Sequence, residues 1–296
     1  MVKTLLAAVL LATLGGCGSG TLSASSLPAW LIGAGDIAIC GSLPASESMA
    51  VRTAALIDAN PGTSVFTLGD NAYVNGTIEE YRTCYGPSWG RFQSRTYPAP
   101  GNHEYNTSGA DGYFTYFGDR AGPSRQGYYS FDIGSWHIVS LNSNIDAVRG
   151  SAQEKWLRAD LAAHHGQRCT MAFWHHPVFS SSSVHGNDPK MLEIWQTLQS
   201  YGADLVLSGH DHDYERFAPQ DADGTPNPQR GIREFVIGTG GASPYLFGTP
   251  KPNSEYRLEN TFGVIRFELR EGSYEWEFIP STPSGLWDSG HALCND

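Results

Sequence analysis

Gly101-Asn102-His103-Glu104 and Gly209-His210-Asp211-His212 are the two stretches that decide how this chain is interpreted. Each comes directly after a short apolar run, Thr96–Ala99 and Asp204–Leu207, that has the length and composition of a β-strand. In open α/β sheets, ligands bind beyond the carboxyl ends of the strands. The two stretches therefore predict that imidazoles, carboxylates and an amide meet at one edge of a sheet.

Three more polar motifs also follow apolar strands directly. They are Gly35-Asp36, Gly69-Asp70-Asn71-Ala72-Tyr73 and His175-His176-Pro177. A single Gly-Asp after a strand is usually only a turn, and a lone pair of histidines is more often part of the packing. Five such motifs in one chain favour a shared site over five unrelated turns.

The residue types in these motifs are those of a metal site. They offer oxygen and nitrogen donors without thiolates, which suits zinc, iron or manganese. A carboxylate such as that of Asp70 can bridge two cations. Two metals about 3.5–4 Å apart are a common arrangement for displacement at phosphorus. The motifs therefore predict a dimetal phosphoesterase.

The hydrophobic pattern predicts an α/β fold. Short strands are expected at Trp30–Ala34, Ser64–Leu68, Thr96–Ala99, Cys169–Phe173, Asp204–Leu207 and Glu234–Ile237, and helices at Glu47–Asp58, Ala152–Ala163 and Pro189–Tyr201. Strands that alternate with helices imply parallel pairing. Two hairpins, Tyr128–Ile133 with Trp136–Asn142 and Val264–Leu269 with Tyr274–Ile279, add antiparallel strands. The residues thus imply one mixed sheet or two sheets.

The composition is that of a packed globular protein. Of the 296 residues, 40% are hydrophobic and 17% are charged. The formal net charge of −11 argues against nucleic acid as a partner, because such binders need clustered Lys and Arg. It does not exclude a small phosphorylated substrate, since bound cations reverse the local potential in a pocket.

The N-terminus has the features of an export signal. Lys3 precedes an apolar run, Leu5–Leu14, that is too short to span a bilayer. The run ends in Leu14-Gly15-Gly16-Cys17, which resembles the bacterial lipoprotein cleavage box. We expect a signal peptide over 1–17 with Cys17 as the lipid anchor, a flexible tether over 18–28 and one catalytic domain over 29–296.

An ordinary signal peptide cut a little later is the alternative. In either case the mature chain leaves the cytoplasm, for the periplasm or the cell surface. The lipid anchor is then its only expected contact with the membrane. The remaining four cysteines lie in a compartment where disulfides persist, and they allow three pairings. We favour Cys40–Cys84, since both follow strand ends that bear motifs, which leaves Cys169 with Cys294.

The five motifs, in their order, resemble those of the calcineurin-like metallophosphoesterase superfamily. The family pattern is an early Asp, then GD, then GNH followed by D or E, then a His, then GHxH. Tyr73 and the stretch Tyr214-Glu215-Arg216 are similar to the purple acid phosphatases within that superfamily. The resemblance covers residues 30–280 and implies a four-layer α/β/β/α sandwich with two mixed β-sheets.

The resemblance also implies a ligand set. It assigns Asp36, Tyr73 and His212 to a first metal, Asn102, His175 and His210 to a second, and Asp70 to both. The first metal is then Fe³⁺ and the second Fe²⁺, Zn²⁺ or Mn²⁺. The sequence departs from the family at Ala38, where many members carry a Gly or a first-metal His; the missing His agrees with a role for Tyr73. We choose His175 over His176 because the family ligand is followed by one residue and then proline.

Two further histidines are candidates for contact with substrate, as is Asn102. His103 is expected to bind the phosphate or act as general acid, although an orienting role is the alternative. His185 lies ten residues after His175, where similar enzymes carry a substrate-side histidine, but it could equally be an ordinary loop residue.

Other residues are expected to have supporting roles. We expect Glu104 to support His103, Asp213 to be solvated, and the aromatic side chains near Tyr113 and Phe117 to pack in the core. Loops 76–89, 106–113 and 240–255 are expected to line the entrance to the site.

The sequence therefore predicts hydrolysis of phosphate monoesters by a metal-activated hydroxide, with no phosphoenzyme. Tyr73 favours the monoester. Phosphodiester hydrolysis on the same centre is one alternative, because the outer loops decide the substrate. A non-catalytic, metal-holding surface lipoprotein is the other.

Overall fold

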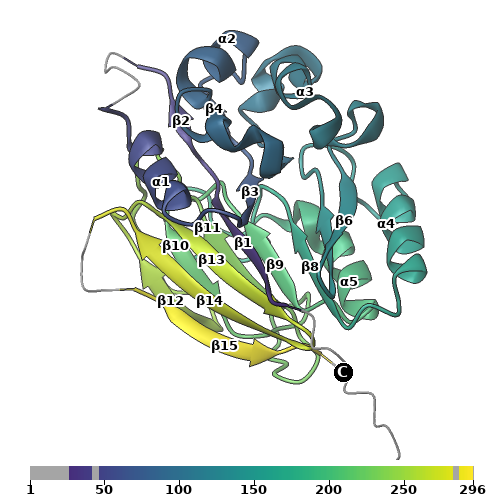
Figure 1. Cartoon of the computed structure of the whole chain (residues 1–296). Coiled ribbons are helices and arrows are strands. Elements are labelled where there is room, and N and C mark those ends of the chain that lie inside the picture. Colours follow the sequence, from purple (N-terminus) through teal and green to yellow (C-terminus); the bar gives the residue numbers. More distant parts are fainter. Residues whose placement is uncertain (1–26, 42–46, 283–286, 296) are drawn as a thin grey trace, which may run out of the picture.

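The computed structural model describes residues 27–41, 47–282 and 287–295 (Figure 1). The expected signal peptide, with Cys17, lies outside the described residues. Two β-sheets pack against each other, and helices cover part of their outer faces. This is the four-layer sandwich with two mixed sheets that the family resemblance implies. Of the two arrangements that the residues left open, one mixed sheet or two sheets, the structure has two large sheets.

The first sheet has six strands in the order β15-β14-β13-β1-β3-β5. Its strands are β1 (Ala29–Ala34), β3 (Ser64–Leu68), β5 (Thr96–Ala99), β13 (Gly263–Arg270), β14 (Ser273–Pro280) and β15 (Ser289–Leu293). Strands β1, β3 and β5 are parallel, whereas β13, β14 and β15 add antiparallel pairs. The parallel half carries three of the five motifs at its carboxyl edge.

The second sheet has seven strands in the order β12-β10-β11-β9-β8-β7-β6. Its strands are β6 (Tyr129–Ile133), β7 (Trp136–Ser140), β8 (Cys169–Phe173), β9 (Leu205–Ser208), β10 (Tyr214–Phe217), β11 (Arg233–Ile237) and β12 (Ser254–Leu258). Strands β7, β8, β9 and β11 are parallel. The ends of β8 and β9 carry the other two motifs.

Helices and short turns complete the chain. The α-helices are α1 (Met49–Asp58), α2 (Ile78–Glu80), α3 (Asp111–Phe117), α4 (Ala152–Ala163) and α5 (Leu192–Ser200). Strands β2 (Ala38–Ile39) and β4 (Ala72–Tyr73) form a separate parallel pair. A π-helical turn spans Tyr81–Tyr85, and 3₁₀ turns span Trp89–Arg95, Glu104–Asn106, Ser108–Ala110, Gly118–Ala121, Pro123–Arg125 and Pro189–Met191.

Strand β8 shows how the layers are held together. Neighbouring residues of a strand point to opposite faces of the sheet. Met171 and Phe173 belong to the core between the sheets, whereas Ala172 packs with Leu157 of α4 and Trp195 of α5 on the outer face. Because both faces are covered, β8 is apolar at nearly every position, which made it easy to recognise.

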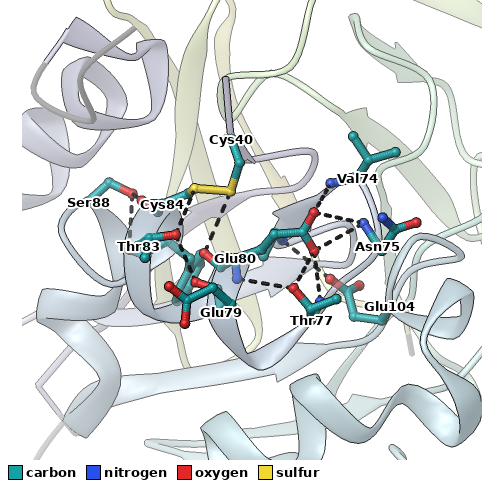
Figure 2. Close-up of a disulfide and its surroundings, with 12 residues drawn as sticks. Cys40, Val74, Asn75, Thr77, Glu79, Glu80, Thr83, Cys84, Ser88 and Glu104 are labelled. Atoms are coloured by element: carbon teal, nitrogen blue, oxygen red, sulfur yellow. Dashed lines mark hydrogen bonds between the residues drawn. A yellow bond between two sulfur atoms is a disulfide. The ribbon is translucent and has the colours of Figure 1, made fainter. Parts of the chain in front are cut away.

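Two disulfides join distant parts of the chain, and both are the pairs that the sequence favours. Cys40 bonds Cys84, and Cys169 bonds Cys294, with Cα–Cα distances of 5.5 and 5.6 Å. Figure 2 shows that the first lies beside Glu80. The carboxylate of Glu80 accepts hydrogen bonds from the backbone N–H of Val74, at 2.6 Å, and from the hydroxyl of Thr77. The segment after Tyr73 is therefore tied to the first turn of α2.

Candidate metal centre

Five strands of the two sheets end at the same place, and each delivers a polar residue there. Asp36 follows β1, Asp70 follows β3 and His210 follows β9, and all three have positive φ angles, of 61°, 48° and 68°. This left-handed conformation costs about 1 kcal/mol or more for a residue with a side chain. The chain turns sharply at three strand ends and brings these side chains into one site.

Asp36, Tyr73 and His212 form the first half of the site. The Tyr73 hydroxyl donates to Asp36 Oδ1 at 2.8 Å and lies 3.1 Å from His212 Nε2. The other ring nitrogen of His212, Nδ1, donates to the carbonyl of Ser243 at 2.8 Å. That bond orients the ring so that Nε2 faces the tyrosine and the aspartate.

Asn102, His175 and His210 form the second half. His175 Nε2 lies 3.0 Å from Asn102 Oδ1 and 3.2 Å from His210 Nδ1. His175 Nδ1 lies 2.7 Å from the carbonyl of Leu68, to which it donates. The second half therefore also has one histidine held by a backbone carbonyl, as metal-binding histidines usually are.

Asp70 lies between the two halves. Its Oδ2 is 3.4 Å from His175 Nε2, and its Oδ1 accepts the backbone N–H of His103 at 2.9 Å. One donor atom each from Asp36, Asp70 and His175 lie within 4.8 Å of one another. The structure thus brings all seven predicted ligands together.

The donor atoms fit a cation. Since Nδ1 of His175 donates to a carbonyl, neutral His175 would turn the lone pair of Nε2 towards the oxygen of Asn102, and two acceptors repel. Burial opposes a charge on His175, but Asp70 outweighs burial and raises the pKa of His175 to about 9. A proton on Nε2 thus relieves the repulsion in the protein alone, and a metal ion suits the same position.

Glu104 has a different role from the one expected. Its carboxylate does not bond the side chain of His103; it accepts the backbone N–H groups of Asp70 and Gly101, at 2.9 and 2.6 Å. It thereby joins the loops after β3 and β5. A side chain at Gly101 would place its Cβ 2.1 Å from Asp70 Oδ1, so only glycine fits there.

His103 and His185 both lie at the site. His103 Nδ1 donates to the carbonyl of Val74 at 2.6 Å, and Nε2 lies 3.8 Å from Asp70 Oδ2. The ring of His185 is stacked on that of His210, with centroids 4.1 Å apart. His103 therefore has a ring nitrogen near the predicted ligand Asp70, and His185 has a ring face against the predicted ligand His210.

Tyr245 is a residue that the sequence did not single out. Its ring is stacked on His212, with centroids 4.0 Å apart and planes at 12°, and lies 5.7 Å from His185. It belongs to loop 240–255, which was expected at the entrance, but no motif surrounds it. Its position at the site becomes evident only from the folded structure, in which loop 240–255 packs against His212.

Asp213 was expected to be solvated, and this is wrong. Its side chain is completely buried, and neither carboxylate oxygen has a hydrogen-bond partner among the described residues. Burial, with the charges of Asp211 and Glu215, raises its pKa well above the usual value. The error arose because Asp213 lies on the tight turn into β10, whose burial depends on both sheets.

His176 is also buried, beside His175. Ser143 Oγ is 2.8 Å from its Nδ1, and its ring centroid is 4.4 Å from that of His210. Burial and the nearby His175 lower the pKa of His176 to about 2. His176 is therefore a neutral neighbour of the second half of the site. His175 is the histidine whose Nε2 lies beside Asn102 Oδ1, at 3.0 Å.

A family model for calcineurin-like phosphoesterases matches residues 32–214, which include all seven predicted ligands. This chain belongs to the calcineurin-like phosphoesterase family. Among sequence relatives of this phosphoesterase chain, purple acid phosphatase 15 of Arabidopsis thaliana is 30% identical over 217 residues, which cover 62% of this chain and 41% of the relative. Purple acid phosphatase 22 of the same plant is 34% identical over 153 residues, covering 49% and 35%.

Solved structures support the same fold. A purple acid phosphatase from yellow lupin seeds has a TM-score of 0.71 at 20% identity, covering 91% of this chain and 54% of that one. GAP50 of Plasmodium has a TM-score of 0.66 at 12% identity, covering 91% and 90%. This phosphoesterase chain spans about a third to a half of the length of the plant sequence relatives it matches. Its likeness to the solved structures concerns the fold alone.

Proposed function

We propose that this chain is a dimetal phosphatase that hydrolyses small phosphate monoesters. The observation that carries the proposal is the convergence of seven oxygen and nitrogen donors, with the phenol of Tyr73 within 3.1 Å of both Asp36 and His212. In the proposed centre, Asp36, Tyr73 and His212 would hold a first metal ion, Fe³⁺. Asn102, His175 and His210 would hold a second, Fe²⁺, Zn²⁺ or Mn²⁺, and the carboxylate of Asp70 would supply a ligand to each.

Two metal ions in such a centre polarise a phosphate ester and lower the pKa of a water molecule. The protein's own groups supply the rest. His103, whose Nδ1 is held by the carbonyl of Val74, is free to use Nε2 to contact the phosphate or to protonate the leaving group. His185 and Tyr245, which stack on His210 and His212, flank the same position and limit which substrates fit.

Phosphodiester hydrolysis is the rival activity, because the same centre serves both reactions. The test compares rates on an aryl phosphate monoester and the matching diester, with wild type and Asp70→Asn loaded with iron and zinc. We expect kcat/KM for the monoester to exceed that for the diester, and Asp70→Asn to lose both activities. A preference for the diester would keep the metal centre but overturn the monoesterase assignment. A non-catalytic role would give no metal-dependent rate on either ester.

We also propose that the protein is exported and anchored by a lipid on Cys17. The support is the order of Lys3, the apolar run Leu5–Leu14 and the box ending in Cys17. Among the described residues, no helix is long and apolar enough to cross a membrane. Labelling with a fatty-acid analogue should mark the wild type and not Cys17→Ala; equal labelling of both would contradict the anchor.

A further inference from the structure

A second group of metal-ligating side chains lies where α4 packs on the β6–β7 hairpin. His137 of β7 is buried, with 1% of its side chain exposed. Its Nδ1 is 2.8 Å from Asp132 Oδ1 on β6, and its Nε2 is 2.8 Å from Asp160 Oδ2 on α4. His164, which caps the end of α4, stacks on His137 with ring centroids 3.9 Å apart.

One ring nitrogen of each imidazole is held by an oxygen atom, as is usual for metal-binding histidines. The Nε2 of His137 donates to Asp160, whose other oxygen accepts the hydroxyl of Ser130 at 2.7 Å. A carboxylate that holds one ring nitrogen fixes the tautomer and raises the basicity of the other. His164 Nδ1 donates to the backbone carbonyl of Asp160 at 2.8 Å, which leaves its Nε2 with a free lone pair.

The charges at this place also favour a cation. The carboxylates of Asp132 and Asp160 face His137, and the C-terminal end of α4 adds partial negative charge. Burial alone would lower the pKa of His137, but the bonds to Asp160 and Asp132 outweigh burial and raise it. The group is therefore neutralised in the protein alone by a proton on His137.

We propose that Asp132, His137 and His164 bind one divalent cation of the zinc type, separate from the candidate dimetal centre. One ligand atom from each of the three residues lies within 4.8 Å of the others. Tetrahedral zinc needs its ligand nitrogens about 3.4 Å apart with both lone pairs aimed at the ion. The ring of His164, whose plane is at 13° to that of His137, therefore has to tilt out of the stack as well as shift by about 1 Å. His164 and Asp132, with 33% and 43% of their side chains exposed, are free to make that shift.

Binding exchanges one cation for one proton at His137. The cation bonds Nδ1, the Nδ1 proton leaves to solvent, and Nε2 keeps its proton and its bond to Asp160. The carboxylate of Asp132 changes its partner from that proton to the cation. The bound cation would link the β6–β7 hairpin to the end of α4. None of its ligands belongs to the seven residues of the candidate dimetal centre.

The test counts zinc on the full chain at pH 7.5, by metal analysis and by competition with a chromogenic chelator. His164→Ala removes one ligand and leaves the His137–Asp160 bond in place. His165→Ala is the matched control, because the neighbouring His165 is exposed and lies outside the group. We expect wild type and His165→Ala to bind one more equivalent of zinc than His164→Ala, or to bind that equivalent at least about tenfold more tightly.

A second measurement separates a metal site from a simple ion-pair contact. Added zinc should raise the unfolding temperature of wild type and His165→Ala more than that of His164→Ala or Asp132→Asn, because only the first two bind the additional ion. Equal zinc stoichiometry, affinity and thermal shift in all four proteins would overturn the proposal. Because the result is a difference between variants, it does not depend on whether the candidate dimetal centre is loaded or active.

Discussion

The phenol of Tyr73 has to lose its proton before it binds a metal. Burial, and then the charges of Asp36 and Asp70, raise its pKa well above 10. In the protein alone the hydroxyl keeps its proton and donates it to Asp36. A trivalent cation offsets this cost better than a divalent one, which is why the position suits Fe³⁺.

At the same scale, His103 is predicted to be the general acid. His103→Ala should lower kcat by about 10²- to 10⁴-fold on an alkyl phosphate, whose leaving group needs a proton. The loss should be much smaller on p-nitrophenyl phosphate, whose leaving group does not. The measurement is kcat for both substrates in wild type and variant. Equal losses on the two substrates would indicate that His103 only positions the phosphate or the metal centre.

Residues that are chemically conspicuous and follow a strand could be predicted from the sequence. All seven predicted ligands, with His103 and His185, lie at one site. Tyr245 and Asp213 could not be predicted. The first reaches the site through a loop whose path no local pattern encodes, and the second is buried by segments far away in the sequence.

At the scale of elements, the parallel strands were predictable because both their faces are covered. Strands β8 and β3 are mostly apolar, and their residues were assigned correctly. Strands β10, β12 and β15 were not predicted, because Tyr214–Phe217, Ser254–Leu258 and Ser289–Leu293 mix polar and apolar residues. They are strands because neighbouring strands offer them hydrogen bonds, which is a property of the sheet.

Glu234 of β11 connects one strand to the loop that follows the His175-His176-Pro177 motif. It accepts the backbone N–H groups of Val178 and Phe179, at 3.1 and 3.0 Å. Burial nevertheless raises its pKa from 4.5 to about 8. Between those values the folded protein keeps a proton that the unfolded chain loses, so the free energy of unfolding should fall as the pH rises from 5 to 8.

Glu234→Gln removes this titration. Its free energy of unfolding should therefore depend less steeply on pH than that of wild type over pH 5 to 8. Urea unfolding at four pH values measures the slope, and Glu79→Gln, at an exposed position, is the control. A Glu234→Gln slope equal to that of wild type would show that Glu234 does not bind a proton in the folded state.

At the scale of the whole molecule, the Cys169–Cys294 disulfide joins the start of β8, in the second sheet, to the segment after β15, in the first. It spans 125 residues of sequence. A loop of that length restricts the unfolded chain by an amount worth about 5 kcal/mol in the chain-entropy description. The disulfide should therefore be a large part of the stability of the fold.

Replacing both Cys169 and Cys294 by alanine should lower the free energy of unfolding by about 3 to 5 kcal/mol. Urea unfolding measures the loss, and wild type kept in a reducing agent should show a loss at least as large. A decrease below about 1 kcal/mol would indicate that packing between the sheets, rather than the disulfide, holds the C-terminal strand in place.

At this scale too, the central proposal is that Tyr73 binds iron in a two-metal phosphatase centre. The most direct test is the visible absorption spectrum of the purified protein, with iron analysis, for wild type and Tyr73→Phe. We predict iron and a broad visible band in wild type, and loss of the band in a folded Tyr73→Phe protein. A colourless wild type without iron, or a band that Tyr73→Phe retains, would contradict the claim.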